Sequence, residues 1–302
     1  MEQTTAQDVF NAHRGLLFSI AYRMLGSASD AEDVLQDAWL RYRGADRAAL
    51  RSPKAFATTI VTRLCLDRLK SAKARREEYV GEWLPEPVLT SEVEGPDTML
   101  QRAESVTLAF LVLLEKLSPE ERAVFLLKEV FEYEHAEVGE ILGVSADNSR
   151  QLLHRAKTHL AGGRPHLTGT PESRRAVAER FARAFSSGDA SALTTMLAQD
   201  VGMWSDGGGK ASAARRPLVG RDEVVNLLVG IFRTAETAGQ VQNASLDIEN
   251  VNSEPALVIR LEERLESIFV LSVEDDRISG IRVVRNPDKL IHIDRQLRKT
   301  AD

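Results

Sequence analysis

The sequence lacks three things: cysteine beyond a single residue, long apolar runs and net positive charge. Cys65 is the only cysteine among 302 residues, so the chain cannot form an internal disulfide and has no thiolate cluster for a metal ion. The N-terminus, MEQTTAQDVF, has no basic segment followed by an apolar one, which argues against a signal peptide. No apolar run approaches the ~18 residues that a membrane-spanning helix needs. These absences predict a cytoplasmic protein without a membrane segment, in which Cys65 is a small buried hydrophobe.

The formal net charge of −6 would argue against nucleic-acid binding only if the charges were spread evenly, and they are not. Seven basic residues and one acid, Asp67, lie between Pro53 and Arg76, whereas four acids and no base lie between Asp30 and Asp37. Most charge runs are only solvated faces. Two runs of opposite sign on consecutive helices are more informative, and they predict one surface for phosphates and another for a basic protein partner.

The stretch WSDGGGKA, residues 204–211, invites comparison with a phosphate-binding loop. Such a loop needs a glycine separated by four residues from the Gly-Lys pair, and Ser or Thr after the pair. Trp204 and Ala211 occupy those positions, and no strand-loop-helix unit frames the stretch. The pattern therefore predicts a structural turn with an exposed basic tip, in which the glycines permit positive φ.

The chain divides into helical segments, two linkers and a C-terminal segment of mixed structure. Apolar residues at spacings of three and four predict helices across residues 7–76 and again over 99–160, with Ser29 as the cap of the second helix. Residues 81–97 are rich in proline and acids and predict a linker, as does the stretch GGRPHLTGTP further on. The predicted parts are 1–80, 81–98, 99–162, 163–171 and 172–302.

After residue 171 the pattern changes. Two helices, about 172–187 and 190–198, precede segments with the alternation of β-strands. RDEVVNLLVGIFRTA is a further helix, which lies between the first of these strand segments and the others. The segments ALVIRLEE, ESIFVLSVEDD and RISGIRVVRN are strands joined by short turns. This order predicts an α+β unit in which helices pack on one strongly bent antiparallel sheet.

Residues 117–160 have the pattern of a helix-turn-helix. Ser118 followed by proline predicts a helix start, Gly143 ends the next helix, and Ser145 caps the last one. A plain helical hairpin is the alternative, but it seldom concentrates base-reading residues on its second helix. The outward residues of that helix are of the types that reach base edges and phosphates: Asn148, Arg150, Gln151, His154, Arg155 and Lys157.

These segments resemble a known family. DAEDVLQDAWLRY (30–42), together with LSPEERAVFLLKEVFEYEHAEVGEILGVS and RQLLHRAK (within 117–157), resembles a bacterial RNA polymerase sigma factor of the extracytoplasmic-function type. The resemblance places region 2 in residues 1 to about 80 and region 4 in residues 99–160. It implies two all-α sigma domains, a region 2 helical bundle and a region 4 helix-turn-helix.

Three further motifs narrow the resemblance. WLPEP (83–87), DGGGKASAARRPLVG (206–220) and NPDKL (286–290) are similar to the subgroup in which a SnoaL-like domain follows region 4. The resemblance then covers essentially the whole chain, and it implies that residues 172–302 form an α+β SnoaL/NTF2-like cone with a bent antiparallel sheet.

The resemblance also implies roles for individual residues. The helix from Ala146 would read the −35 promoter element in the major groove through the outward residues named above. The acidic helix would dock on core RNA polymerase through Asp30, Glu32, Asp33, Gln36 and Asp37. The basic helix and the turn after it would bind and open the −10 element through Arg63, Asp67, Arg68, Ser71, Lys73, Arg75 and Arg76.

Two residues depart from the family pattern in the helix-turn-helix. Ser149 stands where the family usually has an apolar residue, and Gly139 stands where alanine is common. Each departure is expected to loosen the packing by roughly 1 kcal/mol without altering the reading surface.

The C-terminal segment could be an enzyme, because SnoaL-like folds include cyclases and isomerases with an acid-base residue in a pocket. Asp206 and His292 are the candidates for such a residue, but a general base needs a buried site that shifts its pKa towards neutrality, and nothing in the sequence indicates one. We expect no catalytic residue, cofactor or metal. A DNA-binding regulator fused to a ligand-binding or isomerase-like domain is the alternative, and an unknown small-molecule ligand stays open.

We expect the C-terminal domain to dock on the linker and on regions 2 and 4, and so to regulate the sigma regions in cis. Trp83 and Leu84 offer apolar surface on a strip that prolines hold extended. The turn at Lys210 offers positive charge to the acids of the linker. The residues expected to make this regulatory contact are Trp83, Leu84, Pro85, Glu86, Pro87, Asp206, Gly207, Gly208, Gly209, Lys210, Asn286, Pro287, Asp288, Lys289 and Leu290.

Overall fold

The computed structural model describes residues 6–45, 52–77, 79–93, 103–161 and 167–301, without the side chains of 72–77, 92–93 and 301. The chain forms two compact units. The helical unit combines Met1–Glu78 with Ser91–Pro165, and the C-terminal unit combines Tyr79–Thr90 with His166–Asp302. The segment that joins regions 2 and 4 along the chain is therefore part of the C-terminal unit.

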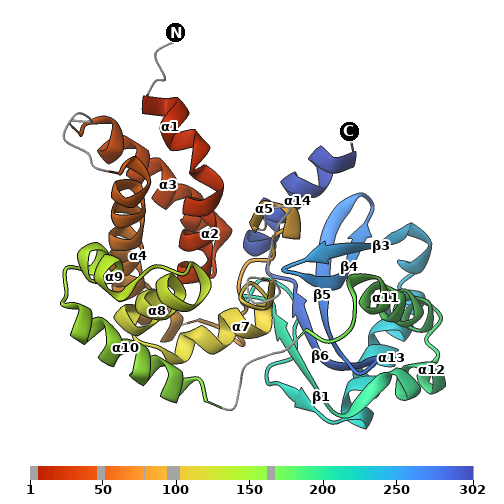
Figure 1. Cartoon of the computed structure of the whole chain (residues 1–302). Helices are drawn as coiled ribbons and strands as arrows, with labels where there is room; N and C mark the ends of the chain where they lie inside the picture. The colour runs from red at the N-terminus through yellow and green to blue at the C-terminus, as the bar shows by residue number, and fades with distance from the viewer. Residues whose placement is uncertain (1–5, 46–51, 78, 94–102, 162–166, 302) are drawn as a thin grey trace. The chain divides into compact units, whose positions relative to one another are not determined.

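The described residues of the predicted region 2 form four helices (Figure 1): α1 (Ala6–Ala12), α2 (Arg14–Leu25), α3 (Ala28–Arg43) and α4 (Pro53–Glu77). Gly26 ends α2 with a left-handed φ of 68°, a conformation that costs glycine little. Ser27 caps α3, because its Oγ accepts a hydrogen bond from the amide of Asp30 at 3.1 Å. The expected cap, Ser29, is thus wrong by two residues, since it already lies inside the first turn. Buried Leu17 and Val34 contribute to the core between these helices.

Region 4 contains the predicted helix-turn-helix, α9 (His135–Leu142) and α10 (Ala146–His159). Ser118 forms a capping box with Glu121 at the start of α8 (Pro119–Phe125), Gly143 ends α9 with a φ of 74°, and Ser145 caps α10. All three local signals are confirmed. The shorter elements are α5 (Thr90–Val93), α7 (Leu108–Leu113), η2 (Leu114–Lys116), α8 (Pro119–Phe125) and a π-helical turn, η3 (Leu126–Val130).

Regions 2 and 4 pack together inside the helical unit through buried arginines. Arg122 of α8 donates to the carbonyl oxygens of Met24 and Leu114, both at 2.7 Å. Arg23 of α2 donates to Ser105 at 3.0 Å and lies 5.7 Å from the ring centre of Phe131. Because Arg122 and Arg23 are only 3% and 2% exposed, losing their partners would leave buried charges unsolvated.

The C-terminal unit is built on a six-stranded sheet in the order β2-β1-β6-β5-β4-β3. The β1–β6 pairing is parallel and the other pairings are antiparallel, which corrects the expectation of a wholly antiparallel sheet. The strands are β1 (Leu197–Asp206), β2 (Leu218–Val219), β3 (Ala244–Val251), β4 (Glu254–Leu261), β5 (Arg264–Glu274) and β6 (Arg277–Val284).

Helices α11 (Pro171–Ser186), α12 (Ala190–Met196) and α13 (Arg221–Thr237) pack on one face of the sheet. Phe181, Met203 and Phe269 belong to the apolar core on this side, which we call the inner face. Because side chains alternate between faces along a strand, Trp204 and Asp206 point to the opposite, outer face.

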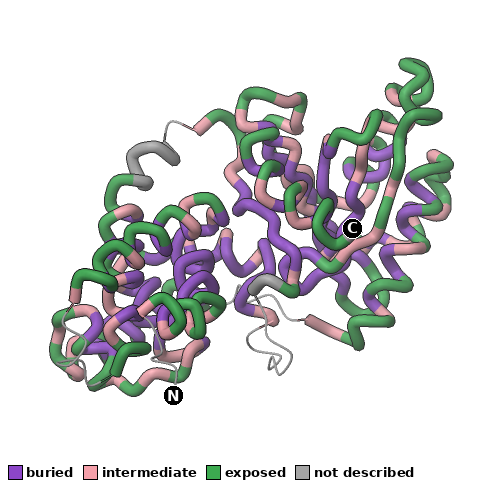
Figure 2. The backbone as a smooth tube through the Cα atoms, turned by 90° about the horizontal axis from the view of Figure 1, so that it is seen from above, coloured by how far each residue is buried: buried purple, intermediate pink, exposed green. Residues whose placement is uncertain are grey.

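The outer face is also covered. Val258, Val270 and Val284 alternate with inner-face residues and are buried. Figure 2 shows buried stretches of backbone within both units. Helix α14 (Pro287–Ala301) contacts β5, and Leu89 of the linker pairs with Val251 at the end of β3. Helix α14 was not predicted from the sequence, although the motif NPDKL overlaps its start.

Candidate functional site

Helix α3 presents the residues predicted to dock on polymerase. Val34, Leu35 and Ala38 are buried, so the helix turns its other side to solvent, where Asp33, Gln36 and Asp37 are exposed. Asp30 and Glu32 are half-buried. The acids at positions 30, 33 and 37 follow helical spacing and form one row, which we call the acidic stripe.

The acidic stripe is bound by a residue that was predicted to contact the −10 element. Nη1 of Arg68 lies 3.0 Å from Asp30 and 3.5 Å from Asp33, and Nη2 lies 3.5 Å from Asp37. Glu32 has its own partner, Arg14, at 2.5 Å. The sequence predicted the two charged helices correctly but did not indicate that they neutralise each other.

The rest of the predicted −10 surface lies along α4. Nε of Arg63 donates to the carbonyl oxygen of Ile141 at 3.0 Å, at the C-terminal end of α9. Asp67 and Ser71 are exposed, and the Ser71 hydroxyl donates to the carbonyl oxygen of Arg68. The side chains of Lys73, Arg75 and Arg76 lie outside the described residues. Arg63 thus joins region 2 to region 4, although its side chain stays exposed.

Helix α10 divides the predicted −35 residues into two groups. Leu152, Leu153 and Ala156 are buried. On the opposite side Arg150, Gln151 and His154 are exposed, whereas Asn148 is half-buried. Arg150 makes an ion pair within its own helix, to Asp147 at 2.5 Å.

Arg155 and Lys157 flank the buried side of α10. Arg155 lies 3.7 Å from Glu121, and Lys157 lies 3.0 Å from Glu129. Their charges are therefore partly compensated by the preceding helical turns. The centre of the exposed face is formed by Arg150, Gln151 and His154, which makes these three the better candidates for base contacts.

The two residues that depart from the family pattern do not loosen the helix-turn-helix. Ser149 is fully buried, and its hydroxyl lies 2.9 Å from Nδ1 of His135, so the polar group is satisfied. Burial lowers the pKa of His135, as do the charges of Lys128 and Arg150. A Cβ at position 139 would lie 2.6 Å from the carbonyl oxygen of Val144. The expectation for Gly139 is therefore wrong, because the turn between α9 and α10 approaches too closely for any larger residue.

In the C-terminal unit, the three subgroup motifs meet at one buried carboxylate. Asp206, at the end of β1, is fully buried. Its Oδ1 accepts a hydrogen bond from the Tyr79 hydroxyl at 2.6 Å, and its Oδ2 accepts from the amide of Leu84 at 2.8 Å and from Lys289 at 2.7 Å. We call this arrangement the linker latch.

The Lys289 ammonium lies in an aromatic cage. Its Nζ is 4.7 Å from the ring centre of Tyr79 and 4.5 Å from that of Trp83, distances at which a cation is attracted to the ring face. The same group donates to the carbonyl oxygen of Leu84 at 2.5 Å, and Asn286 donates to the Tyr79 hydroxyl at 2.8 Å. Burial raises the pKa of Tyr79, as does its hydrogen bond to Asp206, so the phenol stays protonated.

The latch differs from the expected contact in its charges. Among the residues whose side chains are described, Lys210 pairs with Asp288 at 2.5 Å and not with an acid of the linker. Glu86 is buried together with Pro85, Pro87 and Leu290. Lys289, at the fourth position of NPDKL, supplies the cation instead. Tyr79 was missed, because nothing local in the sequence indicates a partner 127 residues away.

The DGGGK stretch is a turn, as expected. Gly208 and Gly209 have φ values of 57° and 70°, and the amide of Lys210 donates to the carbonyl oxygen of Gly207 at 2.9 Å. A side chain at position 208 would collide with Asn286. The glycines therefore allow the turn to approach the latch.

Comparison with known proteins extends this description. The family model for Sigma-70 region 2 matches residues 9–75, and the model for Sigma-70, region 4 matches residues 107–160. The chain is 34% identical over 293 residues to the ECF RNA polymerase sigma factor SigJ of Mycobacterium tuberculosis, covering 93% of this chain and 91% of that protein. It is 30% identical over 284 residues to the probable ECF RNA polymerase sigma factor SigI of the same species, covering 93% of both chains. The chain belongs to the extracytoplasmic-function RNA polymerase sigma factors.

The crystal structure of Mycobacterium tuberculosis SigJ matches this sigma factor with a TM-score of 0.73 and 33% identity, covering 93% of this chain and 96% of that one. A match of this extent includes the C-terminal sheet domain as well as the two sigma regions. The fold class predicted from the motifs is thereby confirmed, with helical sigma domains followed by an α+β sheet domain.

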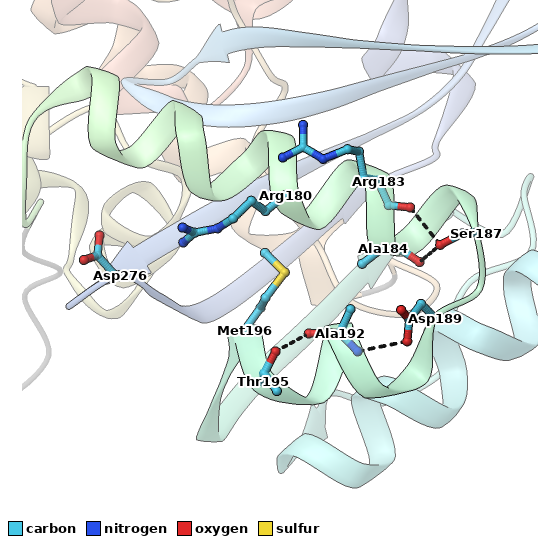
Figure 3. A pocket seen from close by; sticks show the side chains of 9 residues that line it. All are labelled: Arg180, Arg183, Ala184, Ser187, Asp189, Ala192, Thr195, Met196 and Asp276. Carbon is cyan, nitrogen blue, oxygen red and sulfur yellow. Dashed lines mark hydrogen bonds between the residues drawn. The ribbon is translucent and has the colours of Figure 1, made fainter.

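A groove lies between α11 and α12 in the C-terminal domain of this sigma factor, as Figure 3 shows. Its volume is about 540 Å³. Arg180 and Arg183 extend over it from α11, Met196 and Thr195 line it from α12, and Asp276 lies at one end. The Thr195 hydroxyl is already used, since it donates to a carbonyl oxygen of its own helix.

Asp206 and His292, the two residues considered for acid-base chemistry, lie outside the apolar core of the inner face. Asp206 is held in the latch, and His292 lies half-buried on α14. The inner-face core cluster consists of apolar side chains. Within the described ranges, no group of three or more His, Cys, Asp or Glu could hold a metal ion, and none of the helices described there is both long enough and apolar enough to cross a membrane.

Proposed function

We propose that this sigma factor docks on core RNA polymerase through the acidic stripe of α3, binds and opens the −10 element with α4, and reads the −35 element with α10. It acts in the cytoplasm as a promoter-specificity subunit and has no active site of its own. Non-enzymatic regulation is what membership of the family implies, and Phe181, Met203 and Phe269 make the core on the inner face apolar.

The observation that supports this function best is the exposed face of α10. Arg150, Gln151 and His154 lie on the side opposite to the buried residues, on the second helix of a helix-turn-helix. Arginine and glutamine can each make paired hydrogen bonds to one base edge, which a structural hairpin would not require.

Run-off transcription tests the function. Core polymerase, this protein and a library of genomic promoter fragments should yield transcripts from a defined subset of promoters. An absence of transcripts from every fragment would contradict the sigma function. A conventional repressor, the other class of DNA-binding regulator, should bind duplex DNA tightly by itself, whereas this acidic chain should bind weakly until polymerase is present.

We further propose that the C-terminal domain regulates initiation in cis through the linker latch. The latch holds the segment that connects regions 2 and 4, so a bound and a released linker would allow different separations of the two DNA-binding regions. Docking of the C-terminal domain on regions 2 and 4 themselves stays a prediction. An unidentified small molecule that shifts this equilibrium also stays a prediction, with the groove beside α11 as its candidate site.

Replacing Trp83 by Ala and Lys289 by Met removes the aromatic and ionic parts of the latch. In the double variant we expect faster proteolysis within residues 79–90 and a changed transcript yield at equal polymerase occupancy. Lys210→Ala is the matched control, because it removes an exposed lysine near the same turn whose partner is Asp288. Equal cleavage and equal transcription in wild type and the double variant would contradict regulation through the latch.

A further inference from the structure

Arg68 occupies the surface that polymerase is proposed to use. Its guanidinium reaches Asp30, Asp33 and Asp37 from the neighbouring helix, at 3.0 to 3.5 Å. We infer that Arg68 is an internal counter-ion that competes with core polymerase for the acidic stripe, so that docking releases it for the promoter. This inference rests on the proposed docking role of the stripe.

The geometry fits a contact that can be exchanged. The hydrogen bond to Asp30 at 3.0 Å is direct, but the oxygens of Asp33 and Asp37 lie 3.5 Å away. The Asp33 and Asp37 side chains are 65% and 52% exposed. Ion pairs this exposed are weak, so a partner with several bases can displace one guanidinium.

One arginine cannot serve both roles at once. A carboxylate bound to Arg68 presents a weaker negative potential to an incoming cation. In the same way, a guanidinium bound to carboxylates attracts DNA phosphate less strongly. When basic side chains of polymerase take over the carboxylates, the Arg68 side chain loses its partners and gains attraction for a polyanion. Docking and promoter engagement would thereby be coupled through a single side chain.

Arg68→Gln tests the competition, because it removes the charge and keeps a polar side chain of similar reach. We expect the variant to bind core polymerase about 3- to 10-fold more tightly at low salt, with a steeper loss of affinity as salt rises. At saturating polymerase we expect it to open the promoter less completely, measured by permanganate reactivity of unpaired thymines.

Lys70→Gln is the matched control. Lys70 lies two residues away on the same helix and pairs with Glu120 at 3.3 Å, away from the stripe, so its loss should leave polymerase affinity within about 2-fold. Thermal unfolding of both variants separates a binding effect from a folding defect. Arg68→Lys, which keeps the charge but not the forked geometry, should fall between wild type and Arg68→Gln.

Asp33→Asn separates failure of this inference from failure of the proposed function. If Asp33→Asn weakens polymerase binding while Arg68→Gln leaves it unchanged or weakens it, the docking surface holds and the competition is wrong. If Asp33→Asn has no effect, the stripe is not the docking surface and both proposals fall. Tighter binding by Arg68→Gln together with unchanged binding by Lys70→Gln supports the competition.

Discussion

Asp206 and Lys289 face each other at 2.7 Å in a site where their side chains are 0% and 10% exposed. A pair this buried is stable only when further hydrogen bonds satisfy both groups, and here the linker supplies them through Tyr79 and Leu84. The charges belong to the C-terminal domain, but their solvation is provided by the segment between regions 2 and 4. Linker binding and stability of the C-terminal domain are therefore coupled.

Lys289→Met should destabilise the C-terminal domain by about 3–5 kcal/mol, because it leaves the Asp206 carboxylate buried without its cation. Asp206→Asn combined with Lys289→Met should recover part of that loss, since no charge then remains buried. Denaturant unfolding measures both. If Lys289→Met is as stable as wild type, the Asp206 carboxylate is solvated in another way.

Gly139→Ala should destabilise the helix-turn-helix by about 1–3 kcal/mol, because the new methyl group overlaps the carbonyl oxygen of Val144. Gly230→Ala is the matched control in the interior of α13, where nothing lies within 4 Å of the new methyl group. It should stabilise the protein by up to about 1 kcal/mol through helix propensity. If thermal unfolding gives both changes the same sign, the close approach at Gly139 is not limiting.

Substitutions on α10 should fall into two classes. Arg150→Ala or Gln151→Ala should weaken use of the cognate −35 element by about 1–3 kcal/mol and relax its sequence preference. Lys157→Ala should weaken promoter binding more uniformly and lower its salt dependence, as a phosphate contact would. Transcription from a library of −35 variants measures both effects. Unchanged selectivity in every variant would show that α10 does not read the element.

Asp294 on α14 should make the C-terminal domain sensitive to acid. Burial raises the pKa of Asp294, but hydrogen bonds and positive charge from Arg260 and Arg298 outweigh it, and the pKa lies below its usual range. The carboxylate therefore adds stability above its unfolded pKa of about 4, and this stability is lost as the pH falls through the lower folded value. Asp294→Asn should flatten the fall in unfolding free energy below about pH 4. Identical slopes in both proteins would exclude the effect.

The local part of this structure could be predicted from the sequence. The capping residue Ser118, the helix end at Gly143 and the face of α10 follow from nearest-neighbour rules that act within one turn. The second cap was misplaced at Ser29, because two serines compete there and only Ser27 has the extended backbone that a cap requires.

The non-local part could not be predicted. The parallel β1–β6 pairing joins two strands between which all the other strands of the sheet lie in the chain. The alternation pattern of a strand does not tell whether it pairs parallel or antiparallel. Helix α14 had a signal that was overlooked, since Pro287 opens it and Leu290, Ile293 and Leu297 recur at helical spacing and are buried. The partners of Arg68 and Asp206 depend on which helices and turns come together, so the residues could be named but their contacts could not.

Truncation at residue 165, the obvious way to obtain a sigma factor without its extension, would not yield a neutral reference protein. The amides of Leu84, Val88 and Leu89 donate to Asp206, Asn252 and Gln296, and all three leucine or valine side chains are buried. A fragment without those acceptors would expose an apolar segment with open hydrogen-bonding groups, which favours aggregation. Loss of transcription by such a fragment would report its solubility as much as its regulation.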